Sequence, residues 1–356
     1  MLTFERIHPS PESWASTLQQ FPDRTLYQSP SWLAFLEETQ KGEIVIAALH
    51  EGNLVLGYFA GLMIRKFRLR ILGGPLPGWS TSYMGLVLRP EVPRMDAVEA
   101  LRRFAFRDLN CIHLELMDRN LGERAVSERY RYRSYNGFEI DLSRTEDDLF
   151  SRLKRCRRNN IRKAVRSGVV IQEANDAAFA DDYYSQIRDV FAKQHLVPTY
   201  SRERVSALIR HLQPTGNLLL LRAINAEGHC IATGIFPAMH DRAYFWGAAS
   251  WRAFQYLRPN ELLLWHAFQS WKSRSVHFFD MGGAGDYKRK YGGDEISVPW
   301  IRTSRYPVLP LLRNSAALLE ATRQRWHGAW QSIAVSESRT PWRFGQHILD
   351  KVSTLR

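Results

Sequence analysis

Residues 276–293 read VHFFDMGGAGDYKRKYGG, and this stretch sets the expectations for the rest of the chain. The apolar run from Val276 to Phe279 predicts a short buried strand that ends at Asp280. Three glycines within the next five positions allow a sharp turn or a close approach of the backbone to a ligand. A polar, basic and aromatic run that contains Lys288 follows. The pattern is typical either of a buried strand that presents a lysine to a reacting group or of a surface turn with solvated charges.

Composition narrows the class of protein. A chain of 356 residues predicts two domains. Its net charge of +13 and pI near 9.8 suggest a polyanionic partner, which would be a nucleic acid, an anionic membrane surface or a phosphorylated substrate. The three cysteines fit neither a disulfide framework nor a zinc site, and a reducing cytosol suits them best. The sequence begins with no secretory signal and contains no apolar run long enough to span a membrane, so we expect a cytoplasmic protein, with peripheral contact at the inner membrane face as a minor alternative.

The first half predicts helices and strands in alternation. Ser29 is a candidate N-cap, and Pro30 suits the first position of the helix that follows. Residues 65–93 are rich in glycine and proline and predict a surface loop. The remaining expected elements are helices at 10–20 and 95–108, strands at 44–49, 54–64 and 111–117, and a hairpin turn at 51–53.

A similar order of elements returns in the second half. Strands are expected at 217–224 and 229–239, joined by a turn at 226–228, much as the first half joins its strands at 51–53. This repetition indicates a duplicated α/β unit. We therefore expect an N-terminal domain at 1–135, a catalytic C-terminal domain at 136–306 and a basic helical tail at 307–356.

The strongest charge feature opens the second domain. Residues 145–148 resemble a capping box, and eight arginines or lysines without an acid lie between Arg152 and Arg166. The apolar residues of this run have near-helical spacing, and Gly168 ends the helix. An all-basic helix is either a solvated face or a surface that contacts phosphates. On the second reading the phosphate contacts include Arg157, Arg158, Arg162 and Lys163.

A second helix carries a candidate anion site at its start. Residues 244–249 predict a strand, residues 250–258 a loop without glycine, and residues 259–271 an apolar helix with Pro259 at its first position. The free backbone N–H groups at such an N-terminus attract anions, and Arg258 lies beside them.

Four motifs in order resemble the FemAB-like branch of the GNAT acyltransferase superfamily. They read RRNNIRKA at 157–164 with Gly168, RPNELLLW at 258–265, FDMGG at 279–283 and YKRKYG at 287–292. The resemblance implies an α/β (α+β) fold of two tandem GNAT-like domains, each a mixed twisted sheet flanked by helices, with the active cleft mainly in the second domain. Known members transfer an amino acid from aminoacyl-tRNA to the amine of a peptidoglycan precursor, and related proteins act as acyl-CoA-dependent acetyltransferases in cell-envelope or exopolysaccharide synthesis.

The sequence departs from this pattern in three places. A usual GNAT site for acetyl-CoA has a glycine-rich loop ahead of the helix, whereas no glycine lies between Gly247 and Gly282 here. The bridge-forming enzymes tend to carry a lysine at the position of Leu36, which puts a muropeptide acceptor in doubt. The long helical arm that some members use for tRNA is also missing.

Acyl transfer to an amine passes through a tetrahedral oxyanion, so a fixed positive donor gives the largest help. Lys288 is our first choice, and it matches the family motif. Tyr287 and Tyr291 would shape the pocket, and Asp280 would either orient the attacking amine or cap the glycine turn. His195 is a candidate general base or a structural residue. We assign substrate or phosphate binding to the residues Arg258, Asn260, Tyr256, Arg157, Arg158, Arg162, Lys163 and Tyr291.

We thus expect an acyltransferase without a covalent intermediate, a metal or a tightly bound cofactor. Its co-substrate would be an aminoacyl-tRNA, slightly favoured, or an acyl-CoA. Its acceptor would be an amine of a cell-envelope or related small molecule or peptide. The rival from another class is an inactive GNAT-like module that binds an anionic polymer through the basic helix and tail.

Overall fold

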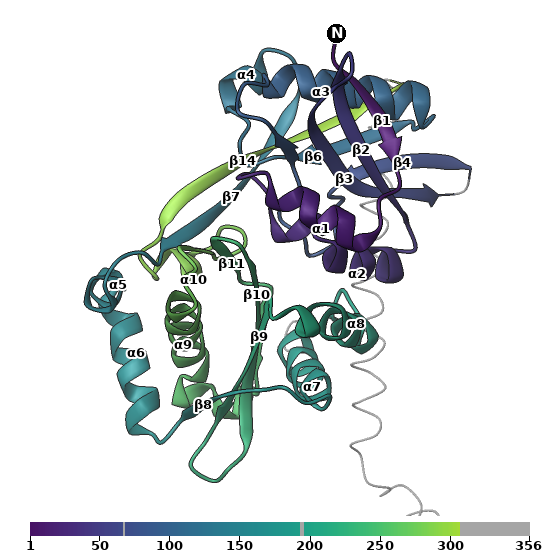
Figure 1. Ribbon diagram of the computed structural model, residues 1–356. Coiled ribbons are helices and arrows are strands. Elements are labelled where there is room, and N and C mark those ends of the chain that lie inside the picture. Colours follow the sequence, from purple (N-terminus) through teal and green to yellow (C-terminus); the bar gives the residue numbers. More distant parts are fainter. Residues whose placement is uncertain (67, 193–195, 307–356) are drawn as a thin grey trace, which may run out of the picture.

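The computed structural model describes residues 1–66, 68–192 and 196–306, so His195 and the basic tail at 307–356 lie outside the described residues. Two α/β halves lie one above the other and are joined by a long two-stranded ribbon (Figure 1). The mixed α/β architecture of two sheet-and-helix units confirms the fold class expected from the sequence.

The described strands form one continuous sheet in the order β1-β2-β3-β4-β6-β14-β7-β13-β11-β10-β9-β8, with β5 paired to β3 and β12 paired to β10. The strands are β1 (Thr3–Ile7), β2 (Glu43–Glu51), β3 (Leu54–Lys66), β4 (Leu69–Gly74), β5 (Leu86–Leu88), β6 (His113–Met117), β7 (Tyr132–Asp141), β8 (Val170–Glu173), β9 (Leu218–Ile224), β10 (Cys230–Met239), β11 (Arg242–Tyr244), β12 (Gly247–Ser250), β13 (Phe278–Asp280) and β14 (Asp294–Ser304).

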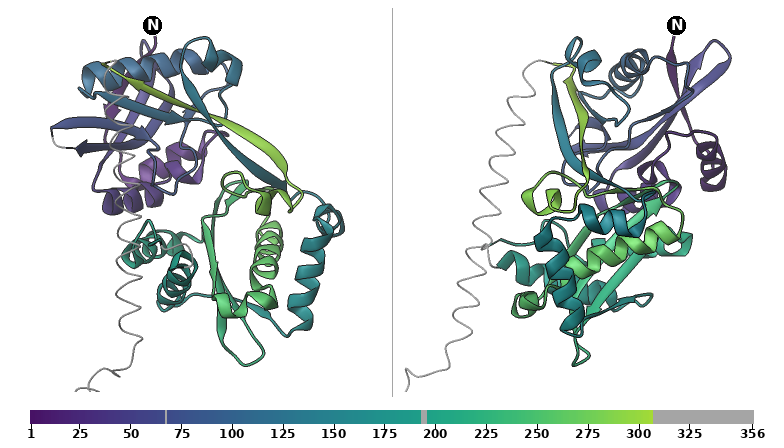
Figure 2. Two further views of the ribbon diagram at one scale, coloured as in Figure 1. Left: turned by 180° about the vertical axis from the view of Figure 1, so that it is seen from behind. Right: turned by 90° about the vertical axis from the view of Figure 1, so that its left-hand side faces the viewer.

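The two halves share the ribbon made by β7 and β14. Strand β14 pairs antiparallel with β7 along most of its length, and its last five residues, from Trp300, also pair with β6 of the first half. Both views in Figure 2 show this ribbon running from one half into the other. The division expected at 135/136 therefore falls inside β7, and we keep two domains as a proposal with this ribbon as their joint.

Helices cover both faces of each half of the sheet (Figure 1). The α-helices are α1 (Pro11–Gln19), α2 (Pro30–Gln40), α3 (Arg94–Arg103), α4 (Glu123–Ser127), α5 (Glu146–Arg152), α6 (Arg155–Arg166), α7 (Phe179–Ala192), α8 (Arg202–Leu212), α9 (Pro259–Ser273) and α10 (Asp286–Arg289). A π-helical turn (Phe104–Asp108) extends α3, and short 3₁₀ turns lie at Leu26–Gln28, Gln213–Thr215 and Arg252–Leu257.

Helix α2 follows the sequence prediction closely. The Ser29 side chain accepts a hydrogen bond from the Trp32 N–H, and Pro30 occupies the first helical position. Trp32 and Phe35 are fully buried in a core that also contains Leu208 of α8, so an apolar cluster joins the two halves. Burial of this kind stabilises the arrangement by about 1.5–3 kcal/mol per large side chain. Cavities at the domain interface thus have firmly packed walls.

Two predictions of elements were wrong. Residues 65–93 are not all loop, because β4 pairs with β3 and β6, and β5 pairs with β3. The glycines of β4 lie in the strand, where a neighbouring side chain or strand leaves no room for a Cβ. The basic run is not one helix either. Leu153 is buried in an extended conformation, and the Lys154 N–H donates to the Lys290 carbonyl, so the chain breaks between α5 and α6.

No helix among the described residues has both the length and the apolar character needed to cross a bilayer.

Candidate active site

The site is organised by a point where two neighbouring strands separate. Strand β11 runs parallel to β13 as far as the pair Tyr244 and Asp280, and the Phe245 N–H still donates to the Asp280 carbonyl at 2.8 Å. Beyond it the chain continues as β12, which pairs only with β10, while β13 ends. The expected single strand at 244–249 is therefore two strands, because the pairing partner changes at Phe245. The separation opens a gap between β12 and the glycine turn.

Asp280 holds the glycine turn in place. Its side chain is 0% exposed, and burial raises the pKa of its carboxyl. One carboxyl oxygen accepts the Gly282 N–H at 2.7 Å, and the other accepts the Tyr83 hydroxyl at 3.0 Å. Gly282 has φ +65°, a conformation that suits glycine. With both oxygens bound inside the fold, Asp280 is placed to position the turn and not to meet an incoming amine.

Lys288 lies on α10 and its ammonium points back toward that turn. A Cβ placed on Gly282 would lie 3.8 Å from Lys288 Nζ, and the Phe245 ring centroid is 5.3 Å from the same nitrogen. Within the described residues the ammonium makes no hydrogen bond and no ion pair. Partial burial lowers the pKa of Lys288, an effect that Asp280 partly offsets. An ammonium without a partner can interact fully with charge that develops on a substrate.

Tyr287 lies on α10 next to Lys288, and Tyr291 follows the end of this helix. Their hydroxyls are 2.8 Å apart, and the Arg157 guanidinium stacks 4.2 Å from the Tyr287 ring centroid. Arg157 is 7% exposed and forms an ion pair with Glu261 at 2.6 Å, while Asn160 Nδ2 donates to the same carboxylate at 2.9 Å. The proposed phosphate contact of Arg157 is therefore revised. This cluster connects the starts of α6 and α9 to α10, which carries Lys288.

The remaining cations of α6 have mixed placements. Arg158 donates to the Ser151 and Leu153 carbonyls and so caps the end of α5. Arg162 and Lys163 are exposed, and the Arg162 guanidinium lies 5.3 Å from the Phe150 ring centroid. An outward basic face thus exists, but Arg157 and Arg158 contribute little to it.

The start of α9 carries the other expected binding residues. Arg258 is exposed and adopts a left-handed conformation with φ 61°. Asn260 Nδ2 donates to the Ser250 hydroxyl at 2.9 Å, and its buried Oδ1 has no hydrogen-bond partner among the described residues. Tyr256 is 61% exposed. Pro259 has no N–H and the acidic Glu261 occupies the first turn, so this helix start offers fewer donors than a glycine-rich loop would.

A cavity of about 470 Å³ adjoins the strand separation, and Gly282, which lines it, lies beside the Lys288 ammonium. Its walls come from the loop between β4 and β5, from the β7–β14 ribbon and from the separation point itself. The lining residues are Tyr27, Pro75, Leu76, Pro77, Gly78, Trp79, Ser80, Thr81, Ser82, Met117, Tyr135, Phe245, Trp246, Gly282 and Trp300. We call it the neutral cavity, because none of these residues is charged.

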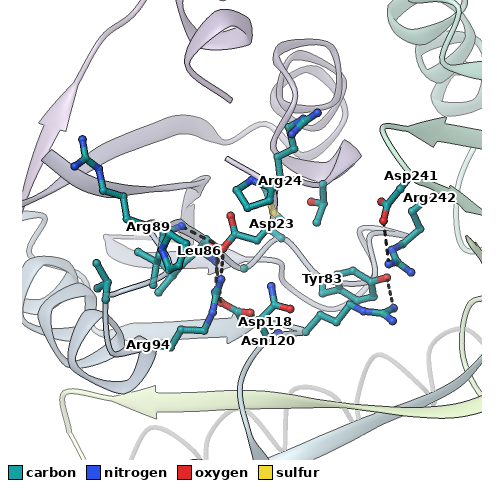
Figure 3. Close-up of a pocket in the computed structure, with 18 residues that line it drawn as sticks. Asp23, Arg24, Tyr83, Leu86, Arg89, Arg94, Asp118, Asn120, Asp241 and Arg242 are labelled. Atoms are coloured by element: carbon teal, nitrogen blue, oxygen red, sulfur yellow. Dashed lines mark hydrogen bonds and ion pairs between the residues drawn. The ribbon is translucent and has the colours of Figure 1, made fainter. Parts of the chain in front are cut away.

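A second cavity, of about 460 Å³, lies at the domain interface near Tyr83 and is drawn in Figure 3. We call it the charged cavity. Its charged lining residues are Asp23, Arg24, Arg89, Arg94, Asp118, Arg119, Asp241 and Arg242. Most of these charges are paired: Arg94 contacts both Asp23 and Asp118, and Arg119 and Arg242 share Glu139.

Tyr83 links the charged cavity to the glycine turn. It lines the charged cavity, accepts a hydrogen bond from Arg119 at 3.2 Å and donates to Asp280. Sequence reasoning missed Tyr83, Arg119, Tyr135 and Trp300, of which the first three lie far from residues 276–293 in sequence. None of them belongs to a local motif, and only pairing of the strands brings them together.

Comparisons with known proteins agree with this geometry. Residues 151–290 match the family model described as an acetyltransferase (GNAT) domain. The crystal structure of FemX superposes with a TM-score of 0.68 at 10% identity, and the match covers 83% of this chain and 97% of that chain. The C-terminal domain of a putative lysylphosphatidylglycerol synthetase from Agrobacterium fabrum gives 0.53 at 9% identity and covers 88% and 97%.

A third similar structure is a tandem GNAT protein from the clavulanic acid biosynthesis pathway, with a TM-score of 0.50, 12% identity and coverage of 86% and 99%. A comparison with curated protein sequences gave no match. Residues 151–290 thus resemble a GNAT acetyltransferase domain, and this match supports an acyltransferase activity. The fold of the chain is similar to that of FemX, and the two findings together support the expected resemblance to FemAB-like members of the GNAT superfamily.

Proposed function

We propose that the protein transfers an aminoacyl group from an activated ester to a primary amine at the separation of β12 and β13, with Lys288 stabilising the oxyanion. The observation that carries this proposal is the half-buried Lys288 ammonium, which makes no hydrogen bond or ion pair with a described residue and lies beside Gly282, a residue that lines the neutral cavity. A preorganised cation at such a place is worth about 2.7–4 kcal/mol in the transition state.

The chemistry needs no covalent enzyme intermediate. The acceptor nitrogen attacks the acyl carbon, an N–C bond forms, and the carbonyl oxygen becomes an oxyanion beside Lys288. The C–O bond to the donor then breaks, and the proton lost by the amine ends on the leaving oxygen. With a thioester donor the C–S bond breaks instead, and the proton ends on sulfur.

The donor is proposed to lie along the starts of α6 and α9. The cluster of Arg157, Glu261 and Tyr287 holds these helices against the lysine-bearing turn, and exposed Arg162 and Lys163 extend a basic face away from it. The glycine-poor start of α9 favours an aminoacyl-tRNA over acetyl-CoA, since the CoA pyrophosphate would lose several backbone hydrogen bonds of about 0.5–1.5 kcal/mol each. Contact of the same basic face with an anionic membrane is a further proposal.

The experiment compares donors directly. Purified protein is titrated with acetyl-CoA by calorimetry, and transfer from labelled aminoacyl-tRNA and labelled acetyl-CoA is measured with a panel of primary amines. We expect a dissociation constant for acetyl-CoA above about 100 μM, given the missing backbone bonds, and Lys288-dependent transfer from aminoacyl-tRNA.

Two other outcomes are decisive. A low-micromolar constant for acetyl-CoA would identify an acyl-CoA-dependent N-acetyltransferase. Failure of both donors to react, together with tight binding of an anionic polymer, would identify an inactive binding module.

A further inference from the structure

The side chains that line the neutral cavity indicate which kind of acceptor it can bind. Aromatic side chains from both halves dominate the lining: Tyr27, Trp79, Tyr135, Phe245, Trp246 and Trp300. Among the described residues no Asp, Glu, Lys, Arg or His lines it, although the whole chain carries 49 lysines and arginines. Despite the net charge of +13, no charged side chain among the described residues lines this cavity, which includes Gly282 of the glycine turn.

One positive charge behind the wall of this cavity is closed off from it. Arg204 is buried behind the loop that forms one wall and donates to the Gly78 and Trp79 carbonyls. Burial lowers the pKa of Arg204 to about 10. Arg204 therefore supports the wall from behind and is not among the residues that line the cavity.

The polar groups of the lining are neutral ones. Thr81 accepts the Trp32 indole N–H at 3.2 Å, and the Ser82 hydroxyl lies between those of Tyr27 and Tyr135. The indole nitrogens of Trp246 and Trp300 are buried without a hydrogen-bond partner in the described part of the chain. These are groups that suit hydroxyl or carbonyl oxygens, together with flat apolar faces that suit ring stacking.

Such walls disfavour an anionic ligand. A phosphate or carboxylate placed here would lose its hydration without gaining a cation, apart from Lys288 at the reaction point. The Lys288 charge disfavours an ammonium at the reaction point, so the acceptor amine would react there in its uncharged, nucleophilic form.

We propose that the acceptor is a primary amine whose body carries no phosphate or carboxylate and presents a flat apolar face to the neutral cavity. This inference rests on the proposed function for the position of the acceptor, and it narrows the substrate class. A nucleoside-diphosphate-linked or carboxylated acceptor does not fit.

Matched pairs of amines test the inference by binding alone. Thermal unfolding is followed with tyramine against tyrosine, and with glucosamine against glucosamine 6-phosphate. The concentrations reach about 10 mM, so that millimolar ligands stabilise measurably, and the pH is about 9, so that more amine is uncharged. In at least one pair, the amine without the carboxylate or phosphate (tyramine or glucosamine) should stabilise the protein. It should also bind at least tenfold more tightly than the anionic amine of the same pair.

A variant places charge in the same cavity. Thr81→Arg should reverse the preference toward glucosamine 6-phosphate, whereas Thr81→Val, which also loses the Trp32 hydrogen bond, should not. Equal or tighter binding of the anionic members to the unchanged protein, or no stabilisation by any of the four amines, would overturn the inference. Because the assay uses no donor and no turnover, failure of acyl transfer would refute only the proposed function.

Discussion

The neutral and charged cavities have nearly the same volume, about 470 and 460 Å³, and both lie at the interface of the two halves. They differ in how charge is used. In the charged cavity, carboxylates and guanidiniums neutralise one another in pairs and triads, as with Arg94 between Asp23 and Asp118. Beside the neutral cavity, one ammonium is half-buried and unpaired among the described residues.

The difference shows that paired and unpaired charges contribute to different properties, the first to stability and the second to catalysis. A paired buried charge holds the structure and has little left to offer a transition state, because its field is already cancelled. An unpaired cation costs stability through desolvation but interacts strongly with a new negative charge. We therefore expect substitutions near the neutral cavity to change turnover, and substitutions of paired residues in the charged cavity to change stability.

The largest effect is expected at Lys288. Lys288→Ala should lower turnover about 10²–10³-fold, the usual loss for one oxyanion donor. Thermal stability should change little, since the ammonium makes no hydrogen bond or ion pair with a described residue and its contact with the Phe245 ring is weak. Lys288→Arg should restore little activity, because a planar guanidinium cannot replace a compact ammonium in a tight turn. Arg289→Ala and Lys290→Ala are matched controls and should stay within about threefold of wild type; an equal loss at Lys290 would move the chemistry elsewhere.

Arg94→Ala should show the opposite pattern. Removing this guanidinium leaves Asp23 and the buried Asp118 without their shared cation, and about 2–3 kcal/mol of unfolding free energy should be lost. Turnover per folded molecule should hardly change. Denaturant unfolding measures the first quantity and single-turnover kinetics the second. Arg89→Ala, an exposed arginine of the same cavity, is the control and should be close to neutral in both assays.

The pH profile gives an independent test of Lys288. Partial burial lowers its pKa in the folded protein below the usual 10.5, so the active ammonium is lost at a lower pH than in a free lysine. Turnover should fall about tenfold per pH unit above the folded pKa. Between the two pKa values the unfolded chain binds more protons, so this group's contribution to stability rises with pH while activity falls. In Lys288→Ala, neither the fall of turnover nor this rise of stability with pH should be seen. If turnover of that variant still fell at high pH as in the wild type, the fall would belong to the titration of another group.

Tyr83 lies between the charged cavity and the glycine turn, and its removal should affect both stability and turnover moderately. Tyr83→Phe deprives the buried Asp280 of one hydrogen-bond donor and Arg119 of one acceptor. We expect a loss of about 1–3 kcal/mol in stability and a loss of turnover of about tenfold, because the glycine turn loses an anchor. Tyr130→Phe, which also loses a hydroxyl–carboxylate bond but lies far from the site, should lose stability alone. If Tyr83→Phe and Tyr130→Phe had equal turnover, Tyr83 would have no part in positioning the catalytic turn.

Much of the fold could be predicted because its signals are local. The N-cap of α2, the hairpin at residues 51–53 and the glycine turn after Asp280 each follow from neighbouring residues. The inward direction of Arg157 could not be predicted, since its partner Glu261 lies 104 positions away. The division of residues 244–249 into β11 and β12 also escaped prediction, because it depends on which strand lies alongside each part. Both cavities are assembled by the same long-range pairing.

The smallest expected effect concerns the outer face of α6, which extends the comparison of paired and unpaired charge to the surface. If Arg162 and Lys163 contact donor phosphates, the double substitution Arg162→Glu/Lys163→Glu should weaken the salt dependence of donor binding. The slope of log K against log salt should become shallower by about 1.4–1.8, because each lost phosphate contact contributes about 0.7–0.9. Arg157→Ala should leave the slope unchanged and lower stability instead, because its guanidinium is committed to Glu261. The matched control is Arg124→Glu/Arg129→Glu, an equal change of net charge on exposed residues of the first half. Filter binding of aminoacyl-tRNA between low and physiological salt measures the slopes. If the α6 and control variants give the same slope, the basic face acts only through net charge, and the donor must be held by the helix starts alone.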